Sequence, residues 1–208
     1  MKISVIMPSF LGEYDGCAKD QAVKMKRAIQ SFLAQDYADK ELIVVCDGCT
    51  DSYNLMHENF NGASITIVFI EKQKLFSGYV RQAGLESATG NIITYLDNDD
   101  VFNFPDHLST IVEGFEKPKI KWVYFNDFVK MYANDTENFL ERNAVINHGQ
   151  IGTSNIAHRN LPNISWEDCD GYGHDFMFIK RLEFNYPKFK KITGPSYLVC
   201  HLKGSVDN

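Results

Sequence analysis

The sequence predicts an α/β protein of three layers, in which helices cover both faces of a mainly parallel central sheet. Two observations support this. Short runs rich in Val and Ile, each ended by a proline or a polar residue, have the composition of strands buried on both faces: "KISVIMP", "ELIVVCD", "SITIVFIE" and "NIITYLD". Segments with helical spacing of apolar residues separate these runs. Alternating strands and helices favour right-handed crossovers and parallel pairing.

The connecting helices differ in how clearly the sequence marks them. The first is the clearest, with apolar residues at helical spacing in a charged segment: Ala22, Met25, Ile29, Phe32 and Leu33. A weaker helix is expected after Asp51. The third is predicted within "SGYVRQAGLESATG", where Ser77 could cap the first turn and Gly90 could end the helix.

The second half of the chain has a looser pattern. A helix is expected after Pro105, and "KWVYFNDFVKMY" is expected to form one strand or a pair. From about Asn134 to Gly173 the chain is polar and rich in Asn, which predicts long functional loops. "HDFMFIKRL" returns to helical character, and "SYLVCHLKG" is typical of a last short strand. We therefore expect residues 1–208 to form a single domain.

Composition excludes several classes of protein. The net charge of -6 and the pI near 5.5 leave no basic surface for nucleic acid. The apolar run at the N-terminus is too short for a signal peptide, and no window approaches the roughly 18 apolar residues of a membrane-spanning helix. We expect a cytoplasmic protein, with peripheral membrane association left open.

The five cysteines are expected to be reduced thiols. An odd number scattered over 208 residues does not match the disulfide framework of a secreted domain. Cys46 and Cys49 have the C-x-x-C spacing of zinc and redox sites, but a zinc site needs a second pair of ligands that the sequence lacks. Two small, partly buried thiols are the favoured interpretation.

Polar residues end each predicted strand, where ligands bind in open α/β sheets. They are Pro8 and Ser9, Asp47 and Asp51, Glu71 and Lys72, and the cluster from Asp97 to Asp100. Carboxylates from several strands would repel one another without a cation, and a D-x-D pair suits Mg²⁺ or Mn²⁺. The alternative is that the cluster only forms a turn before the next helix.

The motifs "SVIMPSF", "AIQSFLAQDYADKELIVVCDGCTD" and "GYVRQAGLESATGNIITYLDNDD" occur in that order over about the first 105 residues. This run resembles family 2 glycosyltransferases with the GT-A fold, whose usual pattern contains E-I-I-V-V-D-D-G-S-T-D and R-N-x-G-x-x-x-A-x-G-x-Y-I-x-x-L-D-x-D-D. The chain departs from the pattern at Cys46, Cys49 and Gln82. Asp47 is consequently the only carboxylate of the D-D-G run.

The resemblance implies a nucleotide-sugar binding half over about residues 1–105 and an acceptor-binding half over about 106–208. The residues implied to contact the nucleotide sugar are Pro8, Ser9, Asp47, Arg81, Asp97 and Asn98. Asp99 is implied to bind Mn²⁺ or Mg²⁺, with Asp97 contributing. For Arg81 an ordinary exposed helix position is the alternative.

The second half matches the family less closely. "HDFMFIKRL" corresponds to E-D-Y-D-L-W-x-R-L, which places His174 at the Glu and makes Asp175 the candidate general base. Asp168, in the literal E-D pair of "WEDCD", is the second choice. His201 in "HLKGS" resembles a late H-x-x-G-S element, so it is either a metal or phosphate ligand or a structural residue. The acceptor side is expected to include Trp166, Asn155 and His158.

The resemblance implies an inverting transferase that moves a sugar from a UDP-sugar to an acceptor hydroxyl on a glycan, a lipid-linked or a protein-linked acceptor. A nucleotidyltransferase is an alternative, but "PSFLGEYDGC" lacks the basic residue that would hold a triphosphate. A module of the same fold that binds a nucleotide sugar or glycan without turnover is another. Nearly every expected carboxylate is present, which favours the enzyme.

Overall fold

The first half of the chain alternates strands and helices as predicted. The computed structural model describes residues 1–14, 17, 20–60, 64–72, 77–133, 136–169 and 171–200. Its first elements are β1 (Ile3–Ser9), α1 (Gln21–Leu33), β2 (Lys40–Asp47), α2 (Thr50–Asn59), β3 (Ile65–Ile70), α3 (Gly78–Ser87) and β4 (Ile92–Tyr95). Ser77 is the N-cap residue of α3, as predicted, although its side chain makes no capping hydrogen bond. The helix ends at Ser87 with Ala88 as its C-cap, so Gly90 does not end it.

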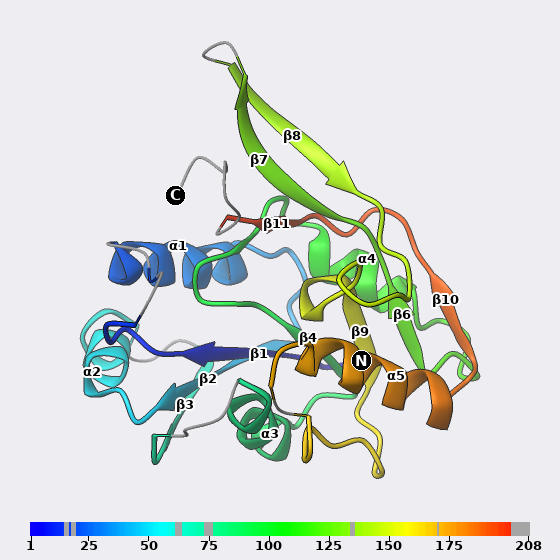
Figure 1. The fold of residues 1–208 in the computed structure, drawn as a ribbon, viewed down its shortest axis with the longest axis horizontal. Helices are drawn as coiled ribbons and strands as arrows, with labels where there is room; N and C mark the ends of the chain where they lie inside the picture. Colours follow the sequence, from blue (N-terminus) through cyan, green and yellow to red (C-terminus); the bar gives the residue numbers. More distant parts are fainter. Residues whose placement is uncertain are drawn as a thin grey trace.

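The second half contains shorter elements. They are β5 (Val101–Phe102), α4 (His107–Glu113), β6 (Trp122–Tyr124), β7 (Asp127–Ala133), β8 (Thr136–Arg142), a 3₁₀ turn η1 (Thr153–Asn155), β9 (Ile156–Arg159), α5 (His174–Asn185), β10 (Phe189–Lys191) and β11 (Tyr197–Val199). The β7–β8 hairpin projects from the body of the molecule (Figure 1).

Two sheets organise these strands. The large sheet has the order β10-β6-β9-β4-β1-β2-β3, and a smaller sheet has the order β5-β11-β7-β8. In the large sheet β1 pairs in parallel with both β2 and β4, and β2 pairs in parallel with β3. Only β9 runs antiparallel to its neighbours β4 and β6 among the described strands of this sheet. The predicted α/β fold with a mainly parallel sheet is confirmed.

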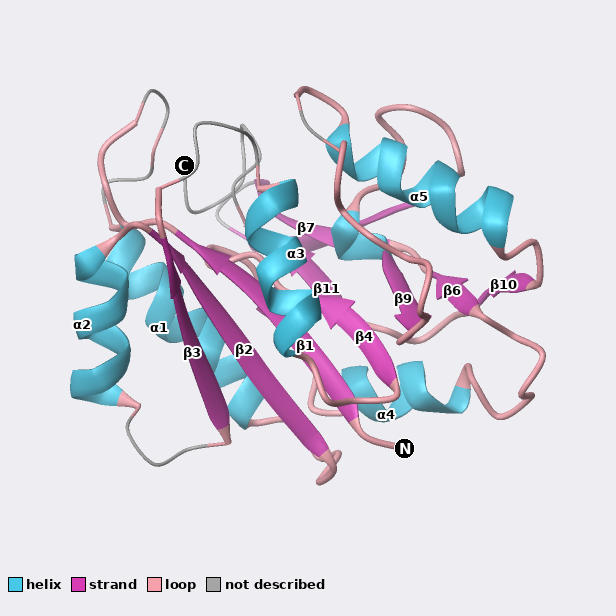
Figure 2. Cartoon of the chain, turned by 90° about the horizontal axis from the view of Figure 1, so that it is seen from below, coloured by secondary structure: helices cyan, strands magenta, loops and turns pink. Residues whose placement is uncertain are grey.

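The helices lie on both faces of the large sheet, as Figure 2 shows. Side chains alternate along β1, so Ile3, Val5 and Met7 face one way and Ile6 the other. The first group packs with α1, α2 and α4. The second side packs with α3 and α5, through residues that include Leu85. Both strand faces are therefore covered, which explains the continuous apolar runs in the sequence.

Of two expectations for the second half, one is confirmed and one needs correction. The "KWVYFNDFVKMY" segment forms a pair of strands, as one of the expected alternatives, with β6 in the large sheet and β7 in the small one. The segment from Asn134 to Gly173, expected to be loops, contains β8 and β9. In β9, Ile156, Ala157 and His158 are fully buried because the strand lies inside the sheet. So short a strand, paired with segments distant in sequence, leaves little local signal.

Candidate active site

A cavity of about 590 Å³ opens at the carboxyl ends of β1, β2 and β4, the edge at which the sequence predicted a ligand site. The residues that line it are Pro8, Ser9, Phe10, Glu13, Tyr14, Asp47, Lys72, Ser77, Val80, Arg81, Asp97, Asn98 and Asp99. Every residue predicted to contact the nucleotide sugar is among them. We call this space the donor cavity.

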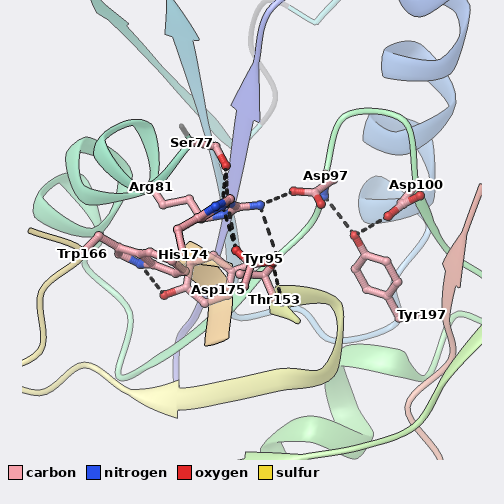
Figure 3. Close-up of polar contacts among 10 residues, drawn as sticks. All are labelled: Ser77, Arg81, Tyr95, Asp97, Asp100, Thr153, Trp166, His174, Asp175 and Tyr197. Carbon is pink, nitrogen blue, oxygen red and sulfur yellow. Dashed lines mark hydrogen bonds and ion pairs between the residues drawn. The ribbon is translucent and has the colours of Figure 1, made fainter. Parts of the chain in front are cut away.

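The residues after β4, Asp97 to Asp100, are held by hydrogen bonds, and they differ in whether they line the donor cavity. The backbone N–H of Asp97 donates to the Tyr197 hydroxyl at 3.0 Å, and that hydroxyl donates to Asp100 Oδ2 at 2.9 Å (Figure 3). The N–H of Cys200 donates to Asp100 Oδ1 at 2.7 Å. Asp100 is thus a buried structural residue, while Asp97, Asn98 and Asp99 line the donor cavity. The cluster does form a turn, since the N–H of Asp100 donates to the Asp97 carbonyl at 3.1 Å, but three of its four side chains also line the donor cavity.

Arg81 is the positive partner of this cluster. Only 3% of the residue is exposed, so the alternative of an exposed helix position was wrong. Its Nη2 donates to Asp97 Oδ1 at 2.7 Å and to Thr153 Oγ1 at 3.2 Å, while Nη1 lies 3.5 Å from Asp175 Oδ1 (Figure 3). Burial alone would lower the pKa of Arg81, but the carboxylates of Asp97 and Asp175 raise it. One guanidinium therefore joins the two halves of the site.

Asp175 lies at the start of α5, beside its neighbour His174. His174 Nε2 is 2.9 Å from Asp175 Oδ1, and the backbone N–H of Thr153 points to Asp175 Oδ2 at 3.4 Å. Burial alone would raise the pKa of Asp175, but Arg81 and His174 outweigh burial and lower it to about 2. The carboxyl group is therefore ionised at neutral pH, as a proton acceptor must be.

Asp47 is ion-paired with Lys72, a residue that was not among those predicted to contact the nucleotide sugar. Lys72 Nζ lies 2.6 Å from Asp47 Oδ2 and 3.6 Å from the centre of the Phe10 ring. Lys72 follows a predicted strand, but Asp47 lies 25 residues before it, so no local pattern predicts that the two side chains pair. Lys72 and Phe10 add a cation and an aromatic face to the donor cavity.

Ser9 lines the donor cavity but is almost completely buried. Its hydroxyl lies 3.0 Å from Ser52 Oγ and 3.2 Å from Met25 Sδ, and Asn98 Nδ2 donates to it at 3.4 Å. These contacts fix the end of β1 against α1, α2 and the cluster after β4.

The five cysteines all lie within the described residues, and none of them forms a disulfide there. Cys46 and Cys49 are buried. Burial, followed by the nearby Cys49, raises the pKa of the Cys46 thiol to about 12. The Cys49 sulfur accepts the N–H of Leu11 at 3.3 Å and so supports the loop that borders the donor cavity.

A second cavity, of about 650 Å³, has Asp175 in its lining. Its lining includes Asp127, Arg142, Gly152, Asn155 and Asp175. None of its lining residues belongs to the donor cavity. Since Asp175 lines this cavity and is ion-paired to Arg81 of the donor cavity, the two spaces meet at this pair. We call the second space the acceptor-side cavity, because Asn155, which was predicted for the acceptor side, lines it.

Trp166 and His158 do not line the acceptor-side cavity, contrary to expectation, because both side chains are fully buried. Trp166 stacks on Phe178 at 3.9 Å between ring centres and donates from Nε1 to Tyr95 Oη at 3.1 Å. The Tyr95 hydroxyl is in turn 2.8 Å from His158 Nε2. Burial lowers the pKa of His158 to about 4. These rings pack beneath the site and cannot stack on a sugar.

Three predicted site residues remain: Asn155, Asp168 and His201. Asn155 borders the acceptor-side cavity, but its Oδ1 accepts the N–H of Gly152 and its Nδ2 donates to the Phe125 carbonyl, which makes it a support of η1. Asp168 is exposed, has a φ of 62°, and lines neither cavity. His201 lies outside the described residues.

The residues of the donor cavity fit part of a divalent-cation site. Asp97 and Asp99 are among its lining residues, and carboxylate oxygens are the hard ligands that such a cation takes. The described residues contain no group of three His, Cys, Asp or Glu that could hold a metal alone. Mg²⁺ commonly takes one or two carboxylates and completes its shell with phosphate oxygens and water, so this pair suits a cation that arrives with a diphosphate.

Comparison with known sequences places the chain among transferases. The model of the family described as "Glycosyl transferase family 2" matches residues 4–182. An uncharacterized glycosyltransferase of Nostoc sp. is 36% identical over 117 residues, which is 56% of this chain and 33% of that protein. The Escherichia coli protein named UDP-Glc:alpha-D-GlcNAc-diphosphoundecaprenol beta-1,3-glucosyltransferase WfgD is 29% identical over 124 residues, or 60% and 45% of the two chains. The chain thus spans less than half of either relative.

Solved structures share its fold. TarS 1-349 of S. aureus in complex with UDP has a TM-score of 0.69 and 17% identity, covering 96% of this chain and 60% of that one. The mannosyltransferase PcManGT from Pyrobaculum calidifontis, in complex with GDP-Man and Mn²⁺, has a TM-score of 0.66 and 13% identity, covering 95% and 56%. At this identity the likeness shows the fold alone, which is the GT-A fold. With the family model matching most of its length, the chain belongs to glycosyl transferase family 2.

Proposed function

We propose that this chain transfers a sugar from a UDP-sugar to an acceptor hydroxyl with inversion at the anomeric carbon, and that Asp175 is the general base. The observation that carries the proposal is the ion pair between Arg81 and Asp175, at which the donor and acceptor-side cavities meet. A transferase must bring a leaving diphosphate and an incoming hydroxyl to opposite sides of one carbon. Two separate cavities that share one charged contact suit that requirement.

On the donor side, the nucleotide is proposed to lie along the ends of β1 and β2. Asp47 would accept a hydrogen bond from the base, beside the Phe10 ring. Lys72 pairs with Asp47, so the base would have to share or displace that ammonium group. Support for UDP as the nucleotide comes from the UDP complex of the fold neighbour and from the donor in the E. coli relative's name.

On the acceptor side, Asp175 would remove the proton from the incoming hydroxyl. The acceptor oxygen then forms its bond to the anomeric carbon, while the bond from that carbon to the phosphate oxygen breaks and UDP leaves with the electron pair. Attack from the side opposite the leaving group inverts the configuration. Arg81 would offset the charge of both Asp97 and Asp175 while the diphosphate is present.

A divalent cation, Mn²⁺ or Mg²⁺, is proposed to be held by Asp99 and Asp97. When bound it would neutralise charge on the leaving diphosphate. Asp97 already accepts a hydrogen bond from Arg81 through Oδ1, and a carboxylate has lone pairs for both partners.

The acceptor is proposed to enter the acceptor-side cavity as a glycan, a lipid-linked or a protein-linked acceptor. The diphosphoundecaprenol in the E. coli relative's name supports a lipid-linked one. Among the described residues, no helix is both long enough and apolar enough to cross a bilayer.

Calorimetric titration with UDP, and with GDP, CDP and ATP as controls, tests the donor half when each is measured with and without Mn²⁺. The proposal expects one nucleoside diphosphate, UDP, to bind in a metal-dependent manner. Release of UDP from UDP-glucose or UDP-N-acetylglucosamine, with water as acceptor, tests turnover. Metal-dependent UDP binding without release from any UDP-sugar would support the non-catalytic module instead.

A further inference from the structure

His174 directly precedes the proposed base, Asp175, and touches it. His174 is the first residue of α5, and its Nδ1 is 3.1 Å from the carbonyl oxygen of Gly171. A carbonyl can only accept a hydrogen bond, so Nδ1 carries a proton in every state of the ring that keeps this contact. Nε2 is consequently the nitrogen that gains or loses a proton.

The neighbours of Nε2 can form a hydrogen bond with it both when it carries a proton and when it does not. It lies 2.9 Å from Asp175 Oδ1, 3.0 Å from Ser77 Oγ and 3.1 Å from Arg81 Nη1. Without a proton, Nε2 can accept a hydrogen bond from Ser77 or Arg81 but faces the lone pairs of Asp175. With a proton, it donates to Asp175 but faces the N–H of Arg81. Each state satisfies one contact and opposes the other, so the ring can change its charge without leaving its place.

The two oxygens of Asp175 face different partners. Oδ1 faces His174 and Arg81. Oδ2 faces Thr153, and a Cβ added to Gly152 would lie 3.3 Å from it. Gly152 lines the acceptor-side cavity, so the lack of a side chain there leaves Oδ2 open to an incoming hydroxyl. A proton would therefore arrive on the oxygen that does not face His174.

We propose that His174 is a positioning residue that accepts, through Asp175, the proton removed from the acceptor hydroxyl. This inference rests on the proposed function. The hydroxyl proton passes to Asp175 Oδ2 as the acceptor oxygen bonds to the anomeric carbon and UDP leaves. Rotation of the carboxyl group about its Cβ–Cγ bond brings the proton to Nε2, which leaves a carboxylate beside an imidazolium. The imidazolium returns the proton to solvent after the products leave.

The charges around His174 fit this role. The groups that face it are Arg81 from α3, Asp175 on its own helix and, beyond Arg81, Asp97 after β4. His148, from the loop after β8, lines a cavity of about 240 Å³ together with His174. Arg81 and the two carboxylates sum to one negative charge, which a proton on His174 brings to zero. Burial raises the pKa of Asp175, but the nearby Arg81 lowers it, which favours passing a newly gained proton on to His174.

Two matched variants and one spectroscopic measurement test the inference. His174→Gln keeps a polar group near Nε2 but cannot take a proton, whereas His174→Glu restores a group that can. With water as acceptor and UDP-glucose or UDP-N-acetylglucosamine as donor, the Gln variant should lose on the order of tenfold to a hundredfold in kcat. The Glu variant should keep most of its kcat. The Mn²⁺-dependent affinity of both variants for UDP should stay within about twofold of the parent.

The pH dependence and the ring itself give the decisive readouts. ¹⁵N NMR of the parent should show the Nδ1–H tautomer of neutral His174, and the acid limb of kcat should share the midpoint of the His174 titration. His174→Gln should lack that limb. A neutral Nε2–H tautomer, equal kcat losses in the two variants, or a Gln variant with the parent's kcat and pH profile would overturn the inference. A parent that binds UDP but releases none from either donor overturns the proposed function, and the inference with it.

Discussion

The guanidinium of Arg81 lies 2.7 Å from Asp97 Oδ1, and this buried ion pair connects α3 to the turn that follows β4. The same guanidinium reaches Asp175 at 3.5 Å and Thr153 at 3.2 Å, so a single side chain sets the distance between the donor cavity and the proposed base. Arg81 is therefore a buried cation that offsets part of the charge of the carboxylate cluster.

Replacement of Arg81 should affect both activity and stability. Arg81→Lys keeps the charge but loses the planar fork that reaches two carboxylates at once. We expect UDP release to fall by at least tenfold and the free energy of unfolding to fall by about 3 kcal/mol, measured by urea denaturation. Arg181→Lys is the control, since Arg181 donates to the carbonyls of Ser165 and Glu167 away from the site. Equal effects of both substitutions would contradict the central place given to Arg81.

The carboxylates after β4 should separate into a ligand-binding and a structural role. Asp99→Asn should abolish the Mn²⁺-dependent part of UDP binding in calorimetry and leave the unfolding midpoint almost unchanged. Asp100→Asn should instead lower the free energy of unfolding by about 1–2 kcal/mol, because Asp100 accepts hydrogen bonds from Tyr197 and Cys200 in a buried position. A reversed pattern would show that the roles assigned to the two residues are exchanged.

Glu41 should make the free energy of unfolding depend on pH in the acid range. Burial alone would raise its pKa, but hydrogen bonds from Lys2, Ser4 and Thr89 lower it from 4.5 to about 2. Because the pKa is lower in the folded state, its stabilisation is complete above pH 4.5 and is lost as the pH falls toward 2. Glu41→Gln should cost about 2–3 kcal/mol at pH 7 and almost nothing near pH 2. The exposed Glu58, changed to Gln, should cost little at either pH.

Gly152 should control access to Asp175. In Gly152→Ala the added Cβ would lie 3.3 Å from Asp175 Oδ2, tight enough to hinder an incoming hydroxyl without removing any charge. We expect kcat for UDP release to fall about tenfold while UDP affinity remains at the parent value. The UDP affinity of the same variant is the internal control, because Gly152 does not line the donor cavity. Unchanged kcat would mean that the acceptor approaches Asp175 from elsewhere.

The donor half could be predicted because its signals are local. Each strand of the first half is a continuous apolar run, and the residue that ends it lies at the sheet edge by geometry alone. All six residues predicted to contact the nucleotide sugar line the donor cavity. The pairing of Arg81 with Asp175 joins residues 94 positions apart, so no local pattern could predict it.

The acceptor half gave weaker predictions for a physical reason. Trp166 and His158 are residue types that serve equally well in a core or at a sugar-binding surface, and only the packing of Phe178 and Tyr95 shows that they are buried. β9 was missed because its burial depends on neighbours, β4 and β6, that lie far away in sequence. Lys72 could have been included in the site from its position at the end of β3, as Asp47 was from the end of β2.

The measurement that tests the central claim most directly compares Asp175→Asn with the parent protein in two assays. Calorimetry with UDP and Mn²⁺ reports on the donor cavity, and release of UDP from UDP-glucose and UDP-N-acetylglucosamine reports on transfer. We expect the variant to bind UDP as the parent does and to lose about 10²- to 10⁴-fold in turnover. A variant that turns over donor at the parent's rate would show that Asp175 is not the base.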